Sequence, residues 1–252
     1  MDHSVIFITD LEKDFVADNT SRCVIKKLNL CVEKKSFICI LGYTGCGKST
    51  LLRLICGLEK PNSGHIYVNG REHLHPTKDV AMIFQDLNQL FPWKTALENV
   101  AYAIRNTNRG KSRRDAKAEA MRLLSEVGLR EFSQYYPHQM SGGMRQRAAV
   151  ARALAIQPKI LLMDEPFSAL DELNRRKLQS LCRQLYEDRD ITILFVTHSI
   201  EESISLADQV VIMNNCEGNI VGILDNVCRH DSSKTTREKF RSAILDLLAN
   251  SY

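Results

Sequence analysis

The sequence is poor in tryptophan and proline and has no long apolar run. Its 252 residues include 1 Trp and 6 Pro, and aromatic side chains make up 7%. No apolar stretch approaches the roughly 18 residues that a membrane-spanning helix needs. The N-terminus carries Asp2, His3 and Asp10 instead of a basic region followed by an apolar core. We therefore expect a chain that neither spans a membrane nor is exported.

The chain also has only a small excess of charge of one sign. The chain has 34 Lys and Arg against 30 Asp and Glu, a formal net charge of +4. The basic clusters at residues 113–114 and 175–177 are typical of solvated helix faces, so no nucleic-acid partner is predicted. With 44% hydrophobic and 25% charged residues, the composition is that of a folded globular protein.

Cysteines are present but lack the spacing of a metal site or a disulfide framework. The 8 cysteines are scattered from Cys23 to Cys228 without paired metal spacing. We expect free, mostly buried thiols in a reducing compartment, which indicates the cytosol.

Strand-like segments fill the first third of the chain and return after residue 160, and helical patterns dominate between residues 94 and 154. Asn69-Gly70 is a strong hairpin signal, and a capping box from Ser112 to Asp115 opens a helix that Gly128 closes. This order predicts β-α-β organisation with a helical insert. Strands are predicted at residues 5–9, 24–32, 37–41, 65–68, 160–163, 191–196 and 209–213, and helices at about residues 172–188 and 237–248.

A glycine-rich loop lies between an apolar strand pattern and an apolar helix pattern. Its glycines let backbone N–H groups turn toward phosphate oxygens, and the following helix directs its positive dipole end at the same anion. Lys48 adds a mobile charge for the β and γ phosphates, and the Ser49 hydroxyl can ligate magnesium. The loop predicts a nucleoside triphosphate with Mg²⁺. The predicted ATP-binding residues here are Gly42, Tyr43, Thr44, Gly45, Cys46, Gly47, Lys48, Ser49 and Thr50.

A second group of candidate residues ends the apolar run at residues 160–163. Asp164 lies where ligands collect in parallel sheets and can reach magnesium, and Glu165 is the candidate general base for an attacking water. Alone, the pair could be a charged cap at a strand end. The phosphate loop upstream favours the catalytic interpretation.

Residues 140–147 read Met-Ser-Gly-Gly-Met-Arg-Gln-Arg and open an apolar-faced helix that runs through Ala155. Ser141 is a natural N-cap, and two glycines bring the backbone close to an incoming anion. Taken alone, this is a capped helix start. The Ser-Gly-Gly and Gln-Arg pattern upstream of the Asp-Glu strand resembles the signature sequence of ATP-binding-cassette proteins. The resemblance covers nearly the whole chain.

The resemblance implies roles for further residues. Gln85 is similar to the family's glutamine loop and His198 to its switch histidine, although each alone would be a polar strand end. Residues 166–171, with Ser168 and Asp171, resemble the loop across the dimer interface.

Phe15 corresponds to an aromatic that the family places against adenine, with Val24 as a second wall, and the alternative for Phe15 is an ordinary core aromatic.

The family mechanism needs two cassettes. The resemblance implies a head-to-tail pair, which we expect to be a homodimer, in which ATP on one phosphate loop is closed by Ser141, Gly142, Gly143 and Met144 of the other copy. Ser49 and Gln85 would ligate Mg²⁺ and Asp164 would hold its hydration shell. Glu165, His198, Gln85 and Lys48 form the predicted catalytic set.

Residues 84–102 contain a Leu-Phe-Pro-Trp stretch followed by Glu-Asn-Val, which resembles cassettes of the nitrate, sulfonate and taurine importers. This implies an ATPase subunit at the cytoplasmic face of a membrane. Its 86–102 surface would receive a permease, and an extracytoplasmic solute-binding protein would act indirectly. Leu90, Phe91 and Trp93 are candidate contacts, and internal packing of the only tryptophan is the alternative. A soluble cassette ATPase without a membrane partner is the rival function.

Some positions depart from the family pattern. Tyr43 and Thr44 replace the usual Pro and Ser of the loop, Met144 replaces a glutamine, and Ser199 follows the histidine where an acidic residue is common. Cys46 lies at a helix N-terminus, where a thiolate is favoured. We nevertheless interpret Cys46 as a small loop residue and not as a redox switch. None of these changes removes a catalytic group.

The predicted fold is a single α/β domain over residues 1–252. A phosphate-loop nucleotidase core with an antiparallel β subdomain is expected at about residues 1–85 and 156–225. An inserted α-helical subdomain is expected at about residues 86–155, and a C-terminal tail helix at about residues 226–252.

Overall fold

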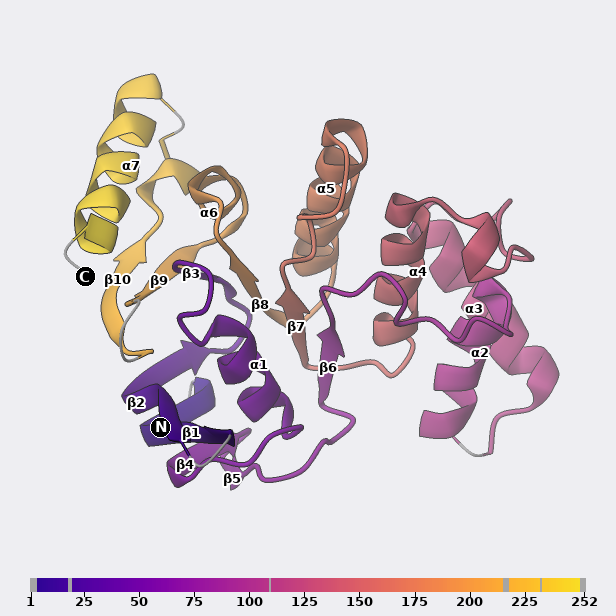
Figure 1. Cartoon of the computed structure of the whole chain (residues 1–252). Helices are drawn as coiled ribbons and strands as arrows, with labels where there is room; N and C mark the ends of the chain where they lie inside the picture. Colours follow the sequence, from indigo (N-terminus) through magenta and orange to yellow (C-terminus); the bar gives the residue numbers. More distant parts are fainter. Residues whose placement is uncertain (1–3, 18–19, 109, 215–217, 232, 250–252) are drawn as a thin grey trace. The chain divides into compact units, whose positions relative to one another are not determined.

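The computed structural model describes residues 4–17, 20–108, 110–214, 218–231 and 233–249 (Figure 1). The chain divides into two compact units, one formed by Met1–Thr77 with Asp190–Tyr252 and the other by Lys78–Arg189. Within the described ranges, no helix combines the length and the apolar character needed to cross a bilayer.

An antiparallel sheet in the first unit has the strand order β2-β1-β4-β5. β1 (Ser4–Ala17) and β2 (Thr20–Glu33) extend beyond the predicted strands, and β4 (Ser63–Val68) pairs with β1. Asn69 and Gly70 have φ of 51° and 73°, as a two-residue hairpin turn into β5 (Arg71–Glu72) requires. The hairpin signal is therefore confirmed.

A parallel sheet segment in the same unit carries the phosphate loop. β3 (Phe37–Leu41) lies between β8 (Thr192–Thr197) and β9 (Gln209–Met213), parallel to both, and β10 (Ile220–Asp225) pairs antiparallel with β9. All residues of β3 and β8 are buried, as expected for strands covered on both faces. α1 (Lys48–Cys56) follows β3 after the glycine-rich loop.

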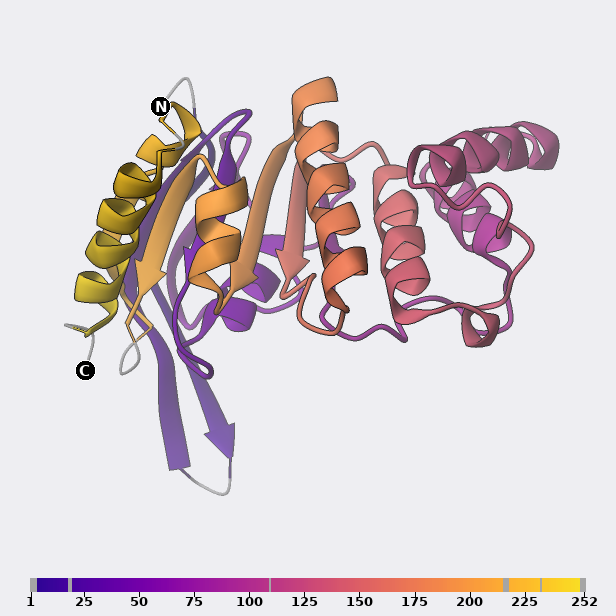
Figure 2. The same ribbon diagram turned by 90° about the horizontal axis from the view of Figure 1, so that it is seen from above.

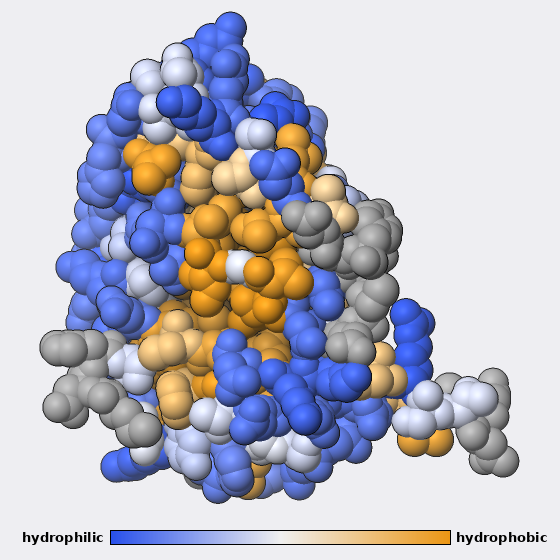
Figure 3. All heavy atoms as spheres, turned by 90° about the vertical axis from the view of Figure 1, so that its left-hand side faces the viewer, coloured by the Kyte–Doolittle hydropathy of each residue, from blue (hydrophilic) through white to orange (hydrophobic). Residues whose placement is uncertain are grey.

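The last helices of the chain pack on this sheet. α7 (Lys234–Ala249) contacts α6 (Ile200–Leu206) and β9 (Figure 2). Its buried residues Phe240, Ile244 and Leu248 recur at helical spacing, so the predicted tail helix is confirmed. Figure 3 shows an apolar area on the side of the molecule where β10 and α7 lie, and the exposed apolar residues of these elements are Val221, Ile223 and Leu245.

In its described residues, the second unit combines two parallel strands with four α-helices. β6 (Val80–Ile83) pairs with β7 (Ile160–Asp164), and α4 (Gly142–Leu154) packs on β6. α2 (Ala96–Thr107) and α3 (Arg113–Glu126) pack on each other and on α4, and α5 (Glu172–Asp188) packs on α4 (Figure 1). Ser112 caps α3 through the Asp115 N–H, as its sequence predicts.

Candidate functional site

The phosphate loop follows β3 and requires glycine at two positions for different reasons. Gly45 and Gly47 have φ of 86° and 99°, in the left-handed region. A Cβ on Gly47 would lie 2.9 Å from the Val24 carbonyl oxygen, whereas one on Gly45 would meet nothing within 4 Å. The sequence therefore folds into a tight cradle in which the backbone of β2 supports Gly47 and places Val24 beside the loop.

Lys48 points into this loop. Its side chain is buried, and Nζ donates to the carbonyl oxygens of Gly42 at 2.8 Å and Tyr43 at 2.7 Å. α1 begins at Lys48 after Gly47, with no side-chain cap. The first N–H groups of α1 are therefore available to donate to an anion. The Lys48 ammonium group can donate to the same anion in place of the loop carbonyl oxygens. The loop fits a phosphate chain, with Tyr43, Thr44 and Gly45 exposed and Ser49 and Thr50 half-buried.

Cys46 is buried inside the loop, and its environment does not favour a thiolate. Burial raises the pKa of the Cys46 thiol, and Lys48 lowers it by less. The Cys46 Sγ lies 3.8 Å from the Lys48 Nζ. The expected effect of the helix N-terminus is therefore outweighed by desolvation, and the structure fits the interpretation of Cys46 as a small loop residue.

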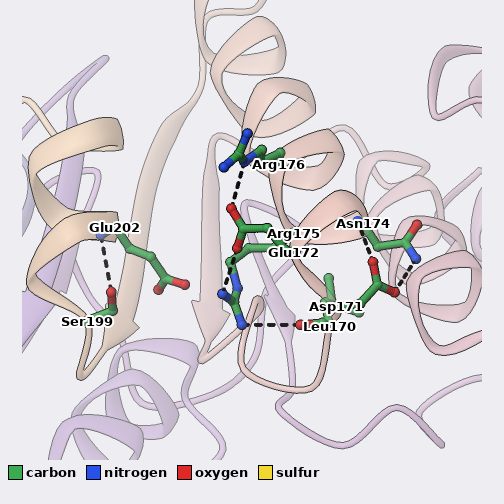
Figure 4. Close-up of polar contacts among 8 residues, drawn as sticks. All are labelled: Leu170, Asp171, Glu172, Asn174, Arg175, Arg176, Ser199 and Glu202. Atoms are coloured by element: carbon green, nitrogen blue, oxygen red, sulfur yellow. Dashed lines mark hydrogen bonds and ion pairs between the residues drawn. The ribbon is translucent and has the colours of Figure 1, made fainter.

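His198 is exposed at the end of β8, and its turn is held by Thr197, Ser199 and Glu202. The Thr197 hydroxyl donates to the buried Glu202 carboxylate at 2.5 Å. The Ser199 hydroxyl accepts from the Glu202 N–H at 3.3 Å and caps α6 (Figure 4). Ser199 thus has a structural role as the N-cap of α6.

Phe15 lies on β1 and is 40% exposed, so it is not a core aromatic. Lys13 Nζ lies 4.9 Å from the centre of its ring. An exposed ring of this kind can stack on a planar base, and its adenine contact stays a prediction.

The second unit brings Gln85 and Glu165 together. Asp164 is 4% exposed at the end of β7. Glu165 follows with a backbone φ of 41°, which is uncommon for a residue other than glycine or asparagine. The Gln85 amide donates to Glu165 Oε2 at 3.2 Å. The hydroxyl of Ser168 donates to the Glu165 carbonyl oxygen at 3.0 Å. The local backbone therefore directs the candidate base toward the glutamine loop.

The signature segment lies against the first turn of α5. Ser141 caps α4 by accepting from the Met144 N–H at 3.3 Å. A Cβ on the buried Gly143 would lie 2.8 Å from the Asn174 side chain, and Asp171 holds Asn174 through bonds of 2.6 and 3.0 Å (Figure 4). The Asn174 donors lower the pKa of the Asp171 carboxyl. Gly142 and Met144 are half-buried beside Gly143.

A buried asparagine supports the segment that follows the glutamine loop. Asn99 is fully buried on α2. Its Oδ1 accepts from the Phe91 N–H at 2.8 Å, and its Nδ2 donates to the carbonyl oxygens of Phe91, Lys94 and Thr95 at 3.0 to 3.2 Å. A polar residue on the apolar face of a predicted helix is the signal that could have identified it.

Two arginines of α4 contact the same segment. Arg152 donates to the Gln89 carbonyl oxygen at 2.7 Å, and Arg145 donates to Asn88 Oδ1 at 3.3 Å. The signature helix and the 88–93 segment are thus joined by direct hydrogen bonds.

Two predicted partner contacts in this segment differ in exposure. Leu90 is buried, so its predicted role as a partner contact is wrong. Trp93 is 69% exposed and is not internally packed.

Comparison with known proteins agrees with these features. The family model described as ABC transporter matches residues 25–168, more than half of the chain. The chain is 41% identical over 213 residues to the nitrate import ATP-binding protein NrtD of Synechocystis sp., covering 84% of this chain and 79% of that protein. It is 42% identical over 192 residues to the bicarbonate transport ATP-binding protein CmpD of the same organism, with coverages of 76% and 68%.

A solved dimeric structure of the ATP-binding cassette MJ0796, in a post-hydrolysis state with ADP and Pi, is similar in fold. The TM-score is 0.80 with 30% identity, covering 88% of this chain and 98% of that chain. The predicted α/β phosphate-loop fold and the predicted ATPase class are confirmed. This chain belongs to the ABC transporter family and is an ATP-binding, ATP-hydrolysing cassette.

Proposed function

We propose that this chain is the ATPase subunit of an importer for small polar solutes of the nitrate, sulfonate or taurine kind. The observation that carries the proposal is the phosphate loop, in which buried Lys48 and the uncapped start of α1 converge on one anion position. The similarity to proteins named for nitrate and bicarbonate import supports the transport context.

Within the phosphate loop, Lys48 and the N–H groups of residues 42–50 bind the β and γ phosphates. Phe15 and Val24 contact the adenine, since one is an exposed ring and the other lies against Gly47. The fold holds each of these groups in place before ATP binds. Binding therefore costs little additional conformational entropy.

Ser49, Gln85 and Asp164 are the residues that we assign to Mg²⁺. No cluster of three His, Cys, Asp or Glu suited to a metal occurs within the described ranges, so the set depends on hydroxyl and amide oxygens and on one carboxylate. Oxygen donors of this kind fit magnesium, which usually keeps several waters. When bound, Mg²⁺ neutralises charge on the transferred phosphoryl group.

Hydrolysis is assigned to residues that end strands. Glu165 accepts the proton of the attacking water, and Gln85 orients its carboxylate, as their 3.2 Å hydrogen bond suggests. His198 contacts the γ-phosphate from the turn that Glu202 and Ser199 hold. Phosphoryl transfer depends mainly on such positioning and on charge neutralisation.

The assembly that we propose contains two copies of this cassette. Ser141, Gly142, Gly143 and Met144 of one copy contact ATP on the other copy's loop, and Ser168 and Asp171 lie in the interface. Two observations support this: Ser141 is exposed, and the Asp171–Asn174 hydrogen bonds hold the Asn174 side chain beside Gly143. Two solved structures of the cassette MJ0796 are dimeric.

A permease binds the 86–102 surface of this chain at the cytoplasmic face of the membrane, and a solute-binding protein acts on the other side. The exposed Trp93 supports this, since aromatic side chains are enriched at interfaces. One experiment tests the function. The Lys48→Ala variant should lose most ATP affinity and ATPase activity, measured by calorimetry and phosphate release; unchanged affinity would contradict the assignment of the loop.

A further inference from the structure

Phe15 lies on the part of β1 that has the least support from the sheet. β1 pairs with β4 only as far as Glu12, and within the described ranges residues 13–17 pair with β2 alone. Figure 2 shows this two-stranded arm extending beyond the rest of the sheet. An isolated two-stranded hairpin is only marginally stable. An aromatic ring on such an arm therefore needs a further contact to keep one position.

Lys13 supplies that contact. Its Nζ lies over the Phe15 ring, 4.9 Å from the ring centre. The Lys13 side chain is only 13% exposed, so its charge is largely withdrawn from water. The attraction between a cation and the face of an aromatic ring is stronger when the cation is desolvated. One face of the Phe15 ring is thus held by a largely buried charge.

The Lys13 ammonium group is itself anchored outside the hairpin. It donates to the Lys60 carbonyl oxygen at 2.9 Å and lies 3.3 Å from Glu59 Oε2. Both partners belong to the segment that follows α1, and the Glu59 N–H donates to the Arg53 carbonyl oxygen of that helix at 3.3 Å. Since α1 begins at the phosphate loop, Lys13 connects the Phe15 ring to the helix that faces the phosphates.

The backbone around Lys13 is fixed by bonds that do not involve its side chain. The Asn62 N–H donates to the Glu12 carbonyl oxygen at 2.9 Å, and Asn62 Oδ1 accepts from the Asp14 N–H at 2.9 Å. The Ser63 hydroxyl donates to Glu12 Oε2 at 2.8 Å. Removal of the Lys13 charge should therefore leave the arm in place and change only how firmly the ring is held.

We propose that Lys13 positions Phe15 for adenine: the cation holds one face of the ring, and the other face stacks on the base. The proposal rests on the proposed function, in which Phe15 contacts the adenine of ATP. The ring is 40% exposed although one face carries the lysine, so it has surface left for a planar ligand. A ring that is held before ATP arrives loses less conformational freedom on binding, which raises the affinity. Lys13 is thus a positioning residue that acts through Phe15.

Calorimetry with two ligands tests this role. Tripolyphosphate has the phosphate chain of ATP but no base, so its binding reports on the phosphate loop alone. Lys13→Gln removes the charge with little change in side-chain length. From the strength of cation–aromatic contacts, we expect ATP to bind this variant about three- to tenfold more weakly, with unchanged binding of tripolyphosphate. Lys13→Arg keeps a cation and should retain close to wild-type ATP affinity.

Two further variants serve as controls. Lys60→Gln makes the same change in charge next to Glu59 but keeps the carbonyl oxygen that Lys13 uses, so it should bind ATP as the wild type does. In a Phe15→Ala background, Lys13→Gln should have no further effect on ATP affinity, because the ring through which Lys13 acts is gone. An equal loss of ATP affinity with Lys60→Gln and Lys13→Gln would overturn the proposal. An equal loss of ATP and tripolyphosphate affinity in Lys13→Gln would also overturn it, because that result indicates a merely structural role.

Failure of the adenine contact and failure of the Lys13 role give different results. If Phe15→Ala binds ATP as tightly as the wild type, the adenine contact of the proposed function fails and the role of Lys13 fails with it. If Phe15→Ala weakens ATP binding and Lys13→Gln does not, the role of Lys13 alone is overturned.

Discussion

The pair Gly47→Ala and Gly45→Ala separates steric support of the phosphate loop from backbone conformation. Both glycines have positive φ, which costs an alanine about 1–2 kcal/mol. Only at Gly47 would the new Cβ meet backbone, 2.9 Å from the Val24 oxygen and 3.3 Å from Val24 Cγ1. Overpacking of this kind adds about 1–3 kcal/mol.

Thermal unfolding followed by circular dichroism measures the difference. For a chain of this size, about 1 kcal/mol shifts the Tm by roughly 2–4 °C, so Gly47→Ala should melt several degrees below Gly45→Ala. Calorimetry with ATP should also show the larger loss of affinity for Gly47→Ala, because a shift of the Val24 backbone or of the loop displaces the N–H groups that face phosphate. Equal Tm values and equal ATP affinities would refute the claim that β2 supports the cradle.

Three further predictions concern other groups. Asn99→Ala should lower the Tm, since the change leaves the Phe91 N–H without its acceptor at a cost of about 1–3 kcal/mol. It should also alter acrylamide quenching of Trp93, the only tryptophan, and unchanged quenching would argue against the support of residues 91–95 by Asn99. Cys46 should alkylate more slowly than the exposed Cys31. Because the pKa of the Cys46 thiol is raised, its alkylation rate should still be rising as the pH passes the ordinary thiol value of 9.0. A faster reaction of Cys46 than of Cys31 near neutral pH would count against the burial of Cys46. Glu202→Gln should destabilise the His198 turn and reduce ATPase activity with little change in ATP affinity, and full activity would remove Glu202 from the support of His198.

Much of the fold follows from local sequence patterns. The predicted strand at residues 37–41 and the helix at residues 172–188 match β3 and α5 at both ends, because a short apolar run and an Asp171 N-cap are local signals. The strands predicted at residues 5–9 and 24–32 are shorter than β1 and β2. The distal parts of β1 and β2 form a long hairpin whose pairing, from Lys13 with Ile25 to Ala17 with Thr20, does not depend on an apolar pattern.

The phosphate loop, Asp164 and Glu165 could be predicted because their chemistry is contiguous in sequence. The contacts in and around the site could not be predicted, because they join distant residues. Arg152 reaches the Gln89 carbonyl oxygen across 63 positions, and Gln85 reaches Glu165 across 80. Leu90 and Trp93 belong to the same apolar stretch, yet one is 2% and the other 69% exposed, which only packing decides.

The most direct test of the central claim measures the mass of Glu165→Gln by light scattering, with and without ATP and Mg²⁺. The account predicts that this variant binds ATP, does not hydrolyse it and changes from a monomer of 28.7 kDa to a species of about twice that mass. The same variant remaining monomeric with ATP bound, or hydrolysing ATP at the wild-type rate, would contradict the two-cassette mechanism and the assignment of Glu165 as its base.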